Sequence, residues 1–263
     1  MLFHDRPGSR AVKRPSDSLC SESLCWGTSA RLLSRSEYPI TALGHRTSVD
    51  IMKFEPQKLA GALLFVAAAQ FLMGMLFAEA LYPGYSISGN YISDLGAFCN
   101  GVFPAAGVCV IYQPTSTIFN SSVFLLGVLL VISAYVFWRP LRWRTFSLLV
   151  LLTGIGAMGV GVFPEIFPVA HEIASDVAFI FAGLSAIWAY RLTKAPMAYM
   201  SVILGVVNLV AIVLFTANIV FGLGVGGMER TVVYPVVLWA VGFGGYLMSS
   251  RTAPVSSPTA PAA

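Results

Sequence analysis

The chain has 263 residues, of which 57% are hydrophobic and only 11% are charged. Ordinary soluble domains carry about 25% charged residues, so this composition excludes a soluble globular domain. The formal charge of +4 is divided among short segments instead of forming one basic face, which argues against a nucleic-acid partner. The apolar runs between the charged clusters reach membrane-spanning length, so the expected partner is the lipid bilayer.

Residues 1–57 are predicted to form a disordered cytoplasmic tail, because they are rich in Arg and Ser and have no sustained apolar periodicity. They contain no apolar h-region, which excludes a secretory signal. A second interpretation is that translation starts at Met52. Met52-Lys53 followed by an apolar run is a common beginning of a bacterial membrane protein, and residues 1–51 would then be a start-site artefact.

Six apolar segments follow within residues 58–249. Each is close to the roughly 20 residues that a helix needs to cross the hydrocarbon. Single apolar spans must satisfy their backbone hydrogen bonds internally, which favours helices. The sequence therefore predicts an all-α, polytopic membrane protein with a six-helix transmembrane bundle, followed by a disordered cytoplasmic tail over 250–263. The expected spans are 59–80, 118–137, 145–163, 170–190, 199–221 and 231–248.

The distribution of Lys and Arg predicts the orientation. With the N-terminus in the cytoplasm, 15 of these residues lie inside and Arg230 alone lies outside. Omitting residues 1–51 leaves 8 against 1. By the positive-inside rule, both termini are cytoplasmic and the protein is a multi-pass protein of the cell membrane.

Small residues within the spans predict close helix packing. Alanines recur at every fourth position from Ala170 to Ala186, and residues 154–161 read GIGAMGVG. Such small-residue stripes let neighbouring helices approach closely within one bundle. Asn208 is expected to form an interhelical hydrogen bond, and Trp239 is expected in the core.

The stretch from Tyr82 to Gly96, YPGYSISGNYISDLG, follows directly on the first apolar segment. Pro83-Gly84 is a turn dipeptide, and the stretch is too polar to continue the helix. It places hydroxyls, an amide and a carboxylate at the membrane boundary.

Acidic side chains gather on the same outer side. From residue 59 onward there are six, all at outer helix ends or in outer loops: Glu79, Asp94, Glu165, Glu172, Asp176 and Glu229. Glu79 ends a helix, where the helix dipole disfavours a carboxylate, so we expect it to have a polar partner or to be uncharged. We predict a polar cluster near the outer boundary made by Ser86, Ser93, Asp94, His171, Asp176, Glu229 and Arg230.

Three functions are compatible with this cluster. It can bind a small polar or cationic ligand, or it can be a hydrogen-bonded network in a structural or assembly partner. The third is a membrane-embedded hydrolase of lipid or peptide, with Asp94, His171 and Asp176 as acid, base or metal ligands, or with Ser86 or Ser93 as nucleophile. Only one histidine lies in the bundle and no CxxC or HExxH motif is present, so the sequence predicts no metal site and identifies no cofactor.

Cys99 and Cys109 flank a short loop that is expected outside, where oxidation is permitted. A disulfide between them is predicted, with two free thiols as the alternative.

Several motifs together resemble the domain-of-unknown-function 998 family of multi-pass prokaryotic membrane proteins. The motifs are Pro83-Gly84-Tyr85-Ser86, Ile92-Ser93-Asp94-Leu95-Gly96, Phe119-Asn120, Phe163-Pro164, His171 and Glu229-Arg230. The resemblance runs from about residue 57 to residue 249. It implies six spans and a membrane location, and it implies no catalytic role for any residue.

Overall fold

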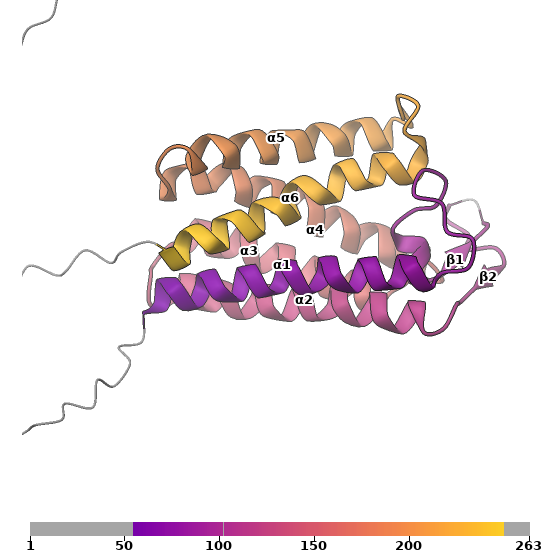
Figure 1. The fold of residues 1–263 in the computed structure, drawn as a ribbon, viewed down its shortest axis with the longest axis horizontal. Coiled ribbons are helices and arrows are strands. Elements are labelled where there is room, and N and C mark those ends of the chain that lie inside the picture. Colours follow the sequence, from indigo (N-terminus) through magenta and orange to yellow (C-terminus); the bar gives the residue numbers. More distant parts are fainter. Residues whose placement is uncertain (1–54, 102, 250–263) are drawn as a thin grey trace, which may run out of the picture. The chain divides into compact units, whose positions relative to one another are not determined.

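The computed structural model describes residues 55–101 and 103–249. The tails predicted over 1–57 and 250–263 therefore lie outside the described residues, except for Glu55, Pro56 and Gln57. The described part contains six helices long and apolar enough to cross a membrane, which confirms the predicted all-α bundle. Figure 1 shows these helices running side by side. They are α1 (Pro56–Leu81), α2 (Thr115–Trp138), α3 (Arg144–Val162), α4 (Pro168–Trp188), α5 (Met197–Thr216) and α6 (Gly224–Ser249).

Shorter elements lie in the connections. A 3-10 turn, η1 (Ser93–Leu95), and two short strands, β1 (Phe98–Cys99) and β2 (Cys109–Val110), lie between α1 and α2. A second 3-10 turn, η2 (Ala189–Leu192), extends α4. The strands pair antiparallel with Cys99 opposite Cys109, and the two Sγ atoms are bonded at 2.09 Å.

The six helices form a closed ring. Each helix packs against its neighbours in sequence, and α6 closes the ring against α1. A weaker contact joins α4 to α6. Of the six, α6 is the most buried and α5 the least, which leaves the ring with one more peripheral helix.

The ends of the bundle differ in charge. Helices α1, α3 and α5 end, and α2, α4 and α6 begin, at the end that carries β1 and β2 in Figure 1; we call it the hairpin end. The opposite end carries the connections after α2 and α4, with Arg139, Arg142, Arg144, Arg191 and Lys194. There the guanidinium of Arg191 lies 4.5 Å from the ring centroid of Trp188, a cation–π contact.

Glycines and alanines let the helix backbones approach closely, as the sequence predicts. A Cβ added at Gly156 of α3 would lie 2.4 Å from the backbone N of Ala178 in α4. One at Gly154 would lie 2.9 Å from the carbonyl oxygen of Gly127 in α2. The Gly-rich segment of α3 thus packs closely against both neighbours, with Gly154 facing α2 and Gly156 facing α4. A larger side chain at either position would push the helices apart.

Polar contacts tie α5 to α6. Asn208 donates from Nδ2 to the carbonyl oxygen of Val232 at 2.8 Å, the interhelical bond expected for this residue. Trp239 is 4% exposed, in the core as predicted, and donates from Nε1 to Ser201 Oγ at 3.1 Å. The two bonds fix the rotation of α6 within the ring.

Two boundaries differ from the sequence-based expectation. Helix α5 ends at Thr216, not near Phe221, and α6 begins at Gly224, not near Thr231. The apolar pattern underestimates the length of α6, because the first turns of this helix contain glycines and the polar pair Glu229 and Arg230. These two residues therefore lie inside a helix, where their side chains project toward the connection after α1.

Candidate functional site

The connection after α1 is held by its own side chains. The Asp94 carboxylate accepts hydrogen bonds from Asn90 Nδ2 and from the backbone N–H of Tyr91, both at 2.9 Å. Asn90 Oδ1 accepts in turn from the backbone N–H of Ser86 at 3.0 Å. Burial raises the pKa of Asp94, and the two donated hydrogen bonds oppose this rise. Asp94 therefore shapes the loop and is turned away from solvent.

Arg230 anchors this loop to the start of α6. Its Nη1 donates to the carbonyl oxygens of Ile87 at 3.0 Å and Gly226 at 2.9 Å. Its Nη2 donates to Tyr85 Oη at 2.7 Å and to Glu79 Oε1 at 2.5 Å. The expected polar partner of Glu79 is thus Arg230, and the pair is buried, with side-chain exposures of 6% for Arg230 and 13% for Glu79. Most donors of the guanidinium are used within this network.

Glu229 precedes Arg230 in α6 but has different contacts. Its Oε2 accepts a short hydrogen bond from the backbone N–H of Ile92. The side chain is 9% exposed and lines two neighbouring cavities. Glu229 therefore links the loop to the interior of the bundle.

The first cavity, which we call the acidic pocket, lies at the hairpin end and has a volume of about 260 Å³. Four carboxylates line it: Glu165, Glu172, Asp176 and Glu229. Ser93, His171, Ser175 and Thr216 add polar atoms. None of the described residues that line this pocket is Lys or Arg. Four carboxylates in one pocket repel each other unless protons or a cation reduce their charge.

Aromatic rings complete the wall of the acidic pocket. Tyr91, Phe179 and Phe215 line it. The rings of Tyr91 and Phe215 meet edge to face, with their centroids 6.0 Å apart. Aromatic faces attract cations through the ring quadrupole, so these rings reinforce the preference of the carboxylates for positive charge.

Glu165 lies in the connection between α3 and α4 and accepts a hydrogen bond from Ser93 Oγ at 2.5 Å. Burial, the largest cause, and the negative charges of Asp94 and Glu172 raise its pKa while the Ser93 bond lowers it, and the net result is a pKa of about 7. This carboxylate therefore titrates near neutral pH.

His171 stands where the pocket meets the bundle interior. Its Nδ1 lies 2.8 Å from the carbonyl oxygen of Phe163. A carbonyl oxygen only accepts, so Nδ1 carries the hydrogen and Nε2 is the acceptor of the neutral ring. The bond fixes the start of α4 against the end of α3.

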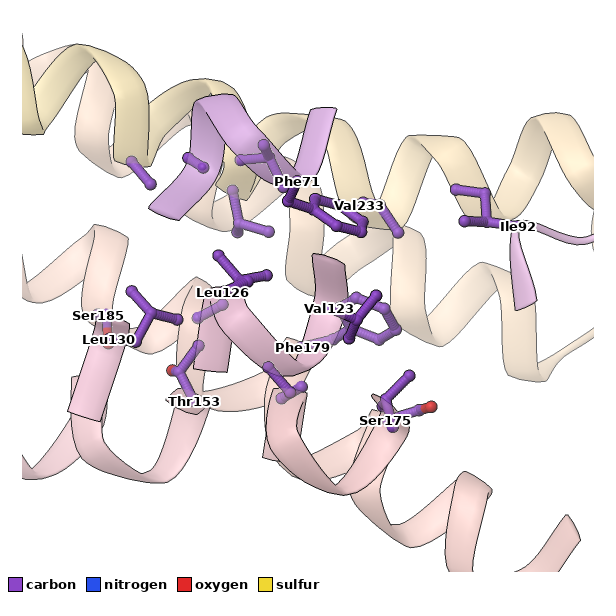
Figure 2. Close-up of a pocket in the computed structure, with 18 of the residues that line it drawn as sticks. Phe71, Ile92, Val123, Leu126, Leu130, Thr153, Ser175, Phe179, Ser185 and Val233 are labelled. Atoms are coloured by element: carbon purple, nitrogen blue, oxygen red, sulfur yellow. The ribbon is translucent and has the colours of Figure 1, made fainter. Parts of the chain in front are cut away.

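The second cavity, which we call the apolar chamber, lies within the ring of helices (Figure 2) and has a volume of about 100 Å³. Its walls are mostly aliphatic and aromatic side chains of α1, α2, α3, α4 and α6, among them Phe71, Val123, Leu126 and Val233. Figure 2 shows Ile92 and Ser175 toward one end and Leu130 and Ser185 toward the other. The chamber and the acidic pocket share the lining residues Ser93, His171, Ser175, Phe179 and Glu229.

The structure divides the residues predicted for the polar cluster into three sets. Ser93, His171, Asp176 and Glu229 line the acidic pocket together. Asp94 and Arg230 lie outside its lining, in the loop and anchor contacts described above. Ser86 is exposed, and its Oγ accepts from the backbone N–H of Gly89 at 3.1 Å within the turn.

Other residues of the site were not in the predicted cluster. Glu165 and Glu172 were recognised only as outer acids, and Tyr85 and Tyr91 only as part of the loop. The position of Glu165 directly after Phe163-Pro164, in a short connection facing the other acids, was the available signal. Phe179 and Phe215 look like ordinary apolar residues of a span, so no local signal marks them.

Comparisons with known proteins give one match. The model of a family described as "Protein of unknown function (DUF998)" matches residues 65–246. The match falls within the range over which the motifs resemble that family and confirms the predicted resemblance. None of the curated proteins and none of the solved structures compared with the chain matches it.

Proposed function

The chain belongs to the DUF998 family, whose description states no activity, and from the geometry of the acidic pocket we propose that this integral membrane protein binds an organic ammonium ion at the extracytoplasmic face. The observation that carries the proposal is the combination of four carboxylates with three aromatic rings in one pocket lined by no described Lys or Arg.

The chemistry of the lining favours an organic cation over a metal ion. Among the described residues, no three His, Cys, Asp or Glu side chains converge closely enough to hold one metal ion. Carboxylates spread around a pocket of about 260 Å³ suit a cation that is larger than a metal ion, such as an organic ammonium ion. Aromatic cages beside carboxylates recognise ammonium groups by the attraction between the cation and the ring faces.

The side of the membrane follows from charge. The end opposite the acidic pocket carries the Arg and Lys residues of the connections after α2 and α4, and the positive-inside rule assigns that end to the cytoplasm. Both termini then lie in the cytoplasm, and the acidic pocket faces the exterior of the cell membrane. The ligand is therefore one that reaches the protein from outside.

The contacts within the site favour binding over hydrolysis. The Asp94 carboxylate accepts hydrogen bonds from Asn90 and Tyr91. His171 Nδ1 donates to a backbone carbonyl oxygen, whereas in a catalytic triad it would donate to a carboxylate that orients the ring as a base. Ser93 Oγ donates to Glu165. These bonds shape a pocket, and we assign no covalent step to them.

Equilibrium binding to the purified full-length chain tests the proposal. We expect methylammonium and tetramethylammonium to bind, and acetate not to bind. Replacing the two exposed carboxylates together, Glu172→Gln with Asp176→Asn, should weaken ammonium binding about fivefold to thirtyfold, since each exposed charge pair contributes up to about 1 kcal/mol.

Matched variants separate the pocket from general charge effects. Glu55→Gln at the other end of α1 should leave ammonium binding unchanged, whereas Tyr91→Ala should weaken it more than Tyr91→Phe, which keeps the ring. Equal binding of acetate and ammonium, or equal effects of Glu55→Gln and the double substitution, would refute the proposed site.

A further inference from the structure

We propose that the ligand is a single-chain amphiphile, with its ammonium head in the acidic pocket and its apolar tail in the apolar chamber. This inference rests on the proposed binding of an organic ammonium ion and specifies its chemical class. It follows from the continuity of two cavities of opposite character.

The two cavities meet at shared residues. Ser93, His171 and Glu229 belong to the linings of both, at the hairpin end of the bundle. On the pocket side the neighbouring groups are carboxylates and aromatic rings, and on the chamber side they are mostly apolar side chains. A ligand placed across this boundary must therefore change from polar to apolar along its own length.

The chamber is deep enough for a tail. Ser175 and Ser185 line it on the same helix, ten positions apart, so they are separated by about 15 Å along α4 at about 1.5 Å per residue. An extended chain advances by somewhat less than the C–C bond length of about 1.5 Å per carbon, so roughly a dozen carbons span this depth. A volume of about 100 Å³ leaves no room for a second chain.

The inner end of the chamber carries a second indication of an occupant. Ser185 is 1% exposed and lines the chamber, and its Oγ has no hydrogen-bond partner among the described residues. Buried hydroxyls are nearly always satisfied, and a polar atom near the end of a ligand tail can satisfy this one. A tail that carries such a polar atom is thus recognised at both ends.

The head is cationic for the reasons already given, and this excludes common amphiphiles with negative heads. A carboxylate, sulfate or phosphate placed among Glu165, Glu172, Asp176 and Glu229 meets only like charge. A single-chain amine provides both the charge for the pocket and the tail for the chamber.

The test uses the full-length protein in detergent and a series of primary n-alkylamines with four to sixteen carbons, measured by equilibrium titration. Transfer of each methylene from water to an apolar site tightens binding by up to about fourfold. Partition of the amine into detergent reduces this gain, but it acts equally on every protein variant and cancels in the ratio of their affinities.

Variants at Ser185 isolate the tail. Ser185→Leu fills the inner end of the chamber, whereas Ser185→Ala removes the hydroxyl without adding bulk. We expect the ratio of wild-type to Ser185→Leu affinity to be near one for butylamine and to reach about tenfold for the chain that spans the chamber, which corresponds to about two excluded methylenes. Ser185→Ala should bind alkylamines as the wild type does, because an alkyl tail has no polar atom to pair with the hydroxyl.

Two further variants distinguish loss of chamber space from a general effect of added bulk on folding. Ala182→Leu adds bulk to the chamber wall one turn away, and Leu184→Phe adds bulk on the exposed face of the same helix. Ala182→Leu should repeat the chain-length effect and Leu184→Phe should not. Melting temperatures without ligand identify any variant that fails to fold.

The outcomes distinguish this inference from the proposed function. Binding of butylamine and dodecylamine with no chain-length dependence in the variant ratios would refute the tail site and leave the ammonium site intact. Absence of binding by every amine would refute both. Tighter binding of dodecanoate or dodecyl sulfate than of dodecylamine would retain a tail site and refute the cationic head. Selective binding of a two-chain lipid with an amine head over single-chain amines would also contradict the inference.

Discussion

Arg230 Nη2 lies 2.5 Å from Glu79 Oε1, so a buried ion pair joins the first turns of the last helix to the last turn of the first. The two residues are 151 positions apart in the chain and belong to the two helices that close the ring. Because the same guanidinium also holds the carbonyl oxygens of the loop after α1, the ion pair and the loop form one network.

Arg230→Ala is expected to destabilise the protein by about 3 to 5 kcal/mol, because it leaves the buried carboxylate of Glu79 without its partner. Loop carbonyls lose their donors at the same time. Equilibrium unfolding in mixed detergent micelles measures the change. Arg230→Lys should recover only part of the loss, since an ammonium has three donors and lacks the planar fork.

A double-mutant cycle with Glu79→Gln tests whether the ion pair carries this effect. The double variant should be less destabilised than the sum of the two single variants, because no charge is left unpaired in it. Strict additivity would show that Arg230 acts through the loop carbonyls alone.

The pKa of about 7 for Glu165 predicts a pH dependence of stability. The ordinary value is about 4.5, so between these values the folded protein binds a proton that the unfolded chain has released. Stability therefore falls as pH rises from about 4.5 to about 7, by about 3 kcal/mol in total, and is constant with respect to this group above that range.

Glu165→Gln should remove this component, so the difference in unfolding free energy between wild type and variant measures it. The comparison is needed because other titratable groups face Glu165. They are Tyr91 and Asp94 in the loop, His171, Glu172 and Asp176 on α4, and Glu229 on α6. Parallel pH profiles for the two proteins would contradict the assignment to Glu165.

The bond between Cys99 and Cys109 predicts a specific labelling pattern. In a Cys20→Ser, Cys25→Ser background, a maleimide reagent should label neither remaining cysteine until a reductant is added, and both afterwards. Opening the bond should lower stability by at most about 3 kcal/mol, from the chain entropy of a loop of this length. Labelling without reductant would show that the thiols are free in the native protein.

The proposed orientation predicts opposite signals from two reporter fusions. A fusion after Trp143, between α2 and α3, should report a cytoplasmic location, and one after Gly222, between α5 and α6, an extracytoplasmic location. Reversed signals would place the acidic pocket in the cytoplasm and require a ligand from that side.

Local patterns predicted the helices, their order and their close packing. Apolar length identified six spans, and the small residues at 154–161 and along α4 identified the tight contacts. Composition could not locate the start of α6, since helix formation there depends on contacts with the loop. Gly224, at φ +76°, and Gly226 pack their backbones against residues 87–90, an arrangement that only the folded bundle defines.

The site was predicted less completely because its parts come from five separate segments. Charge sign and topology placed the acids at one end of the bundle. They did not reveal that Arg230 would pair with Glu79, and thus leave the acidic pocket with no Lys or Arg among its described lining residues. The apolar chamber has no signal in the sequence, because its lining residues are typical of any buried helix face. The cavity exists because the side chains of five helices do not fill the space between them.

The contact between α1 and α6 also sets the order in which the protein is assembled during synthesis. Ribosomes add about 5 to 20 residues per second, so Glu79 is made roughly 8 to 30 seconds before Arg230. Throughout that interval the ring is open on one side, and the loop after α1 has neither its anchor nor Glu229 beside Ile92. The acidic pocket is consequently incomplete until α6 is made, because Glu229 and Val232 of that helix belong to its lining.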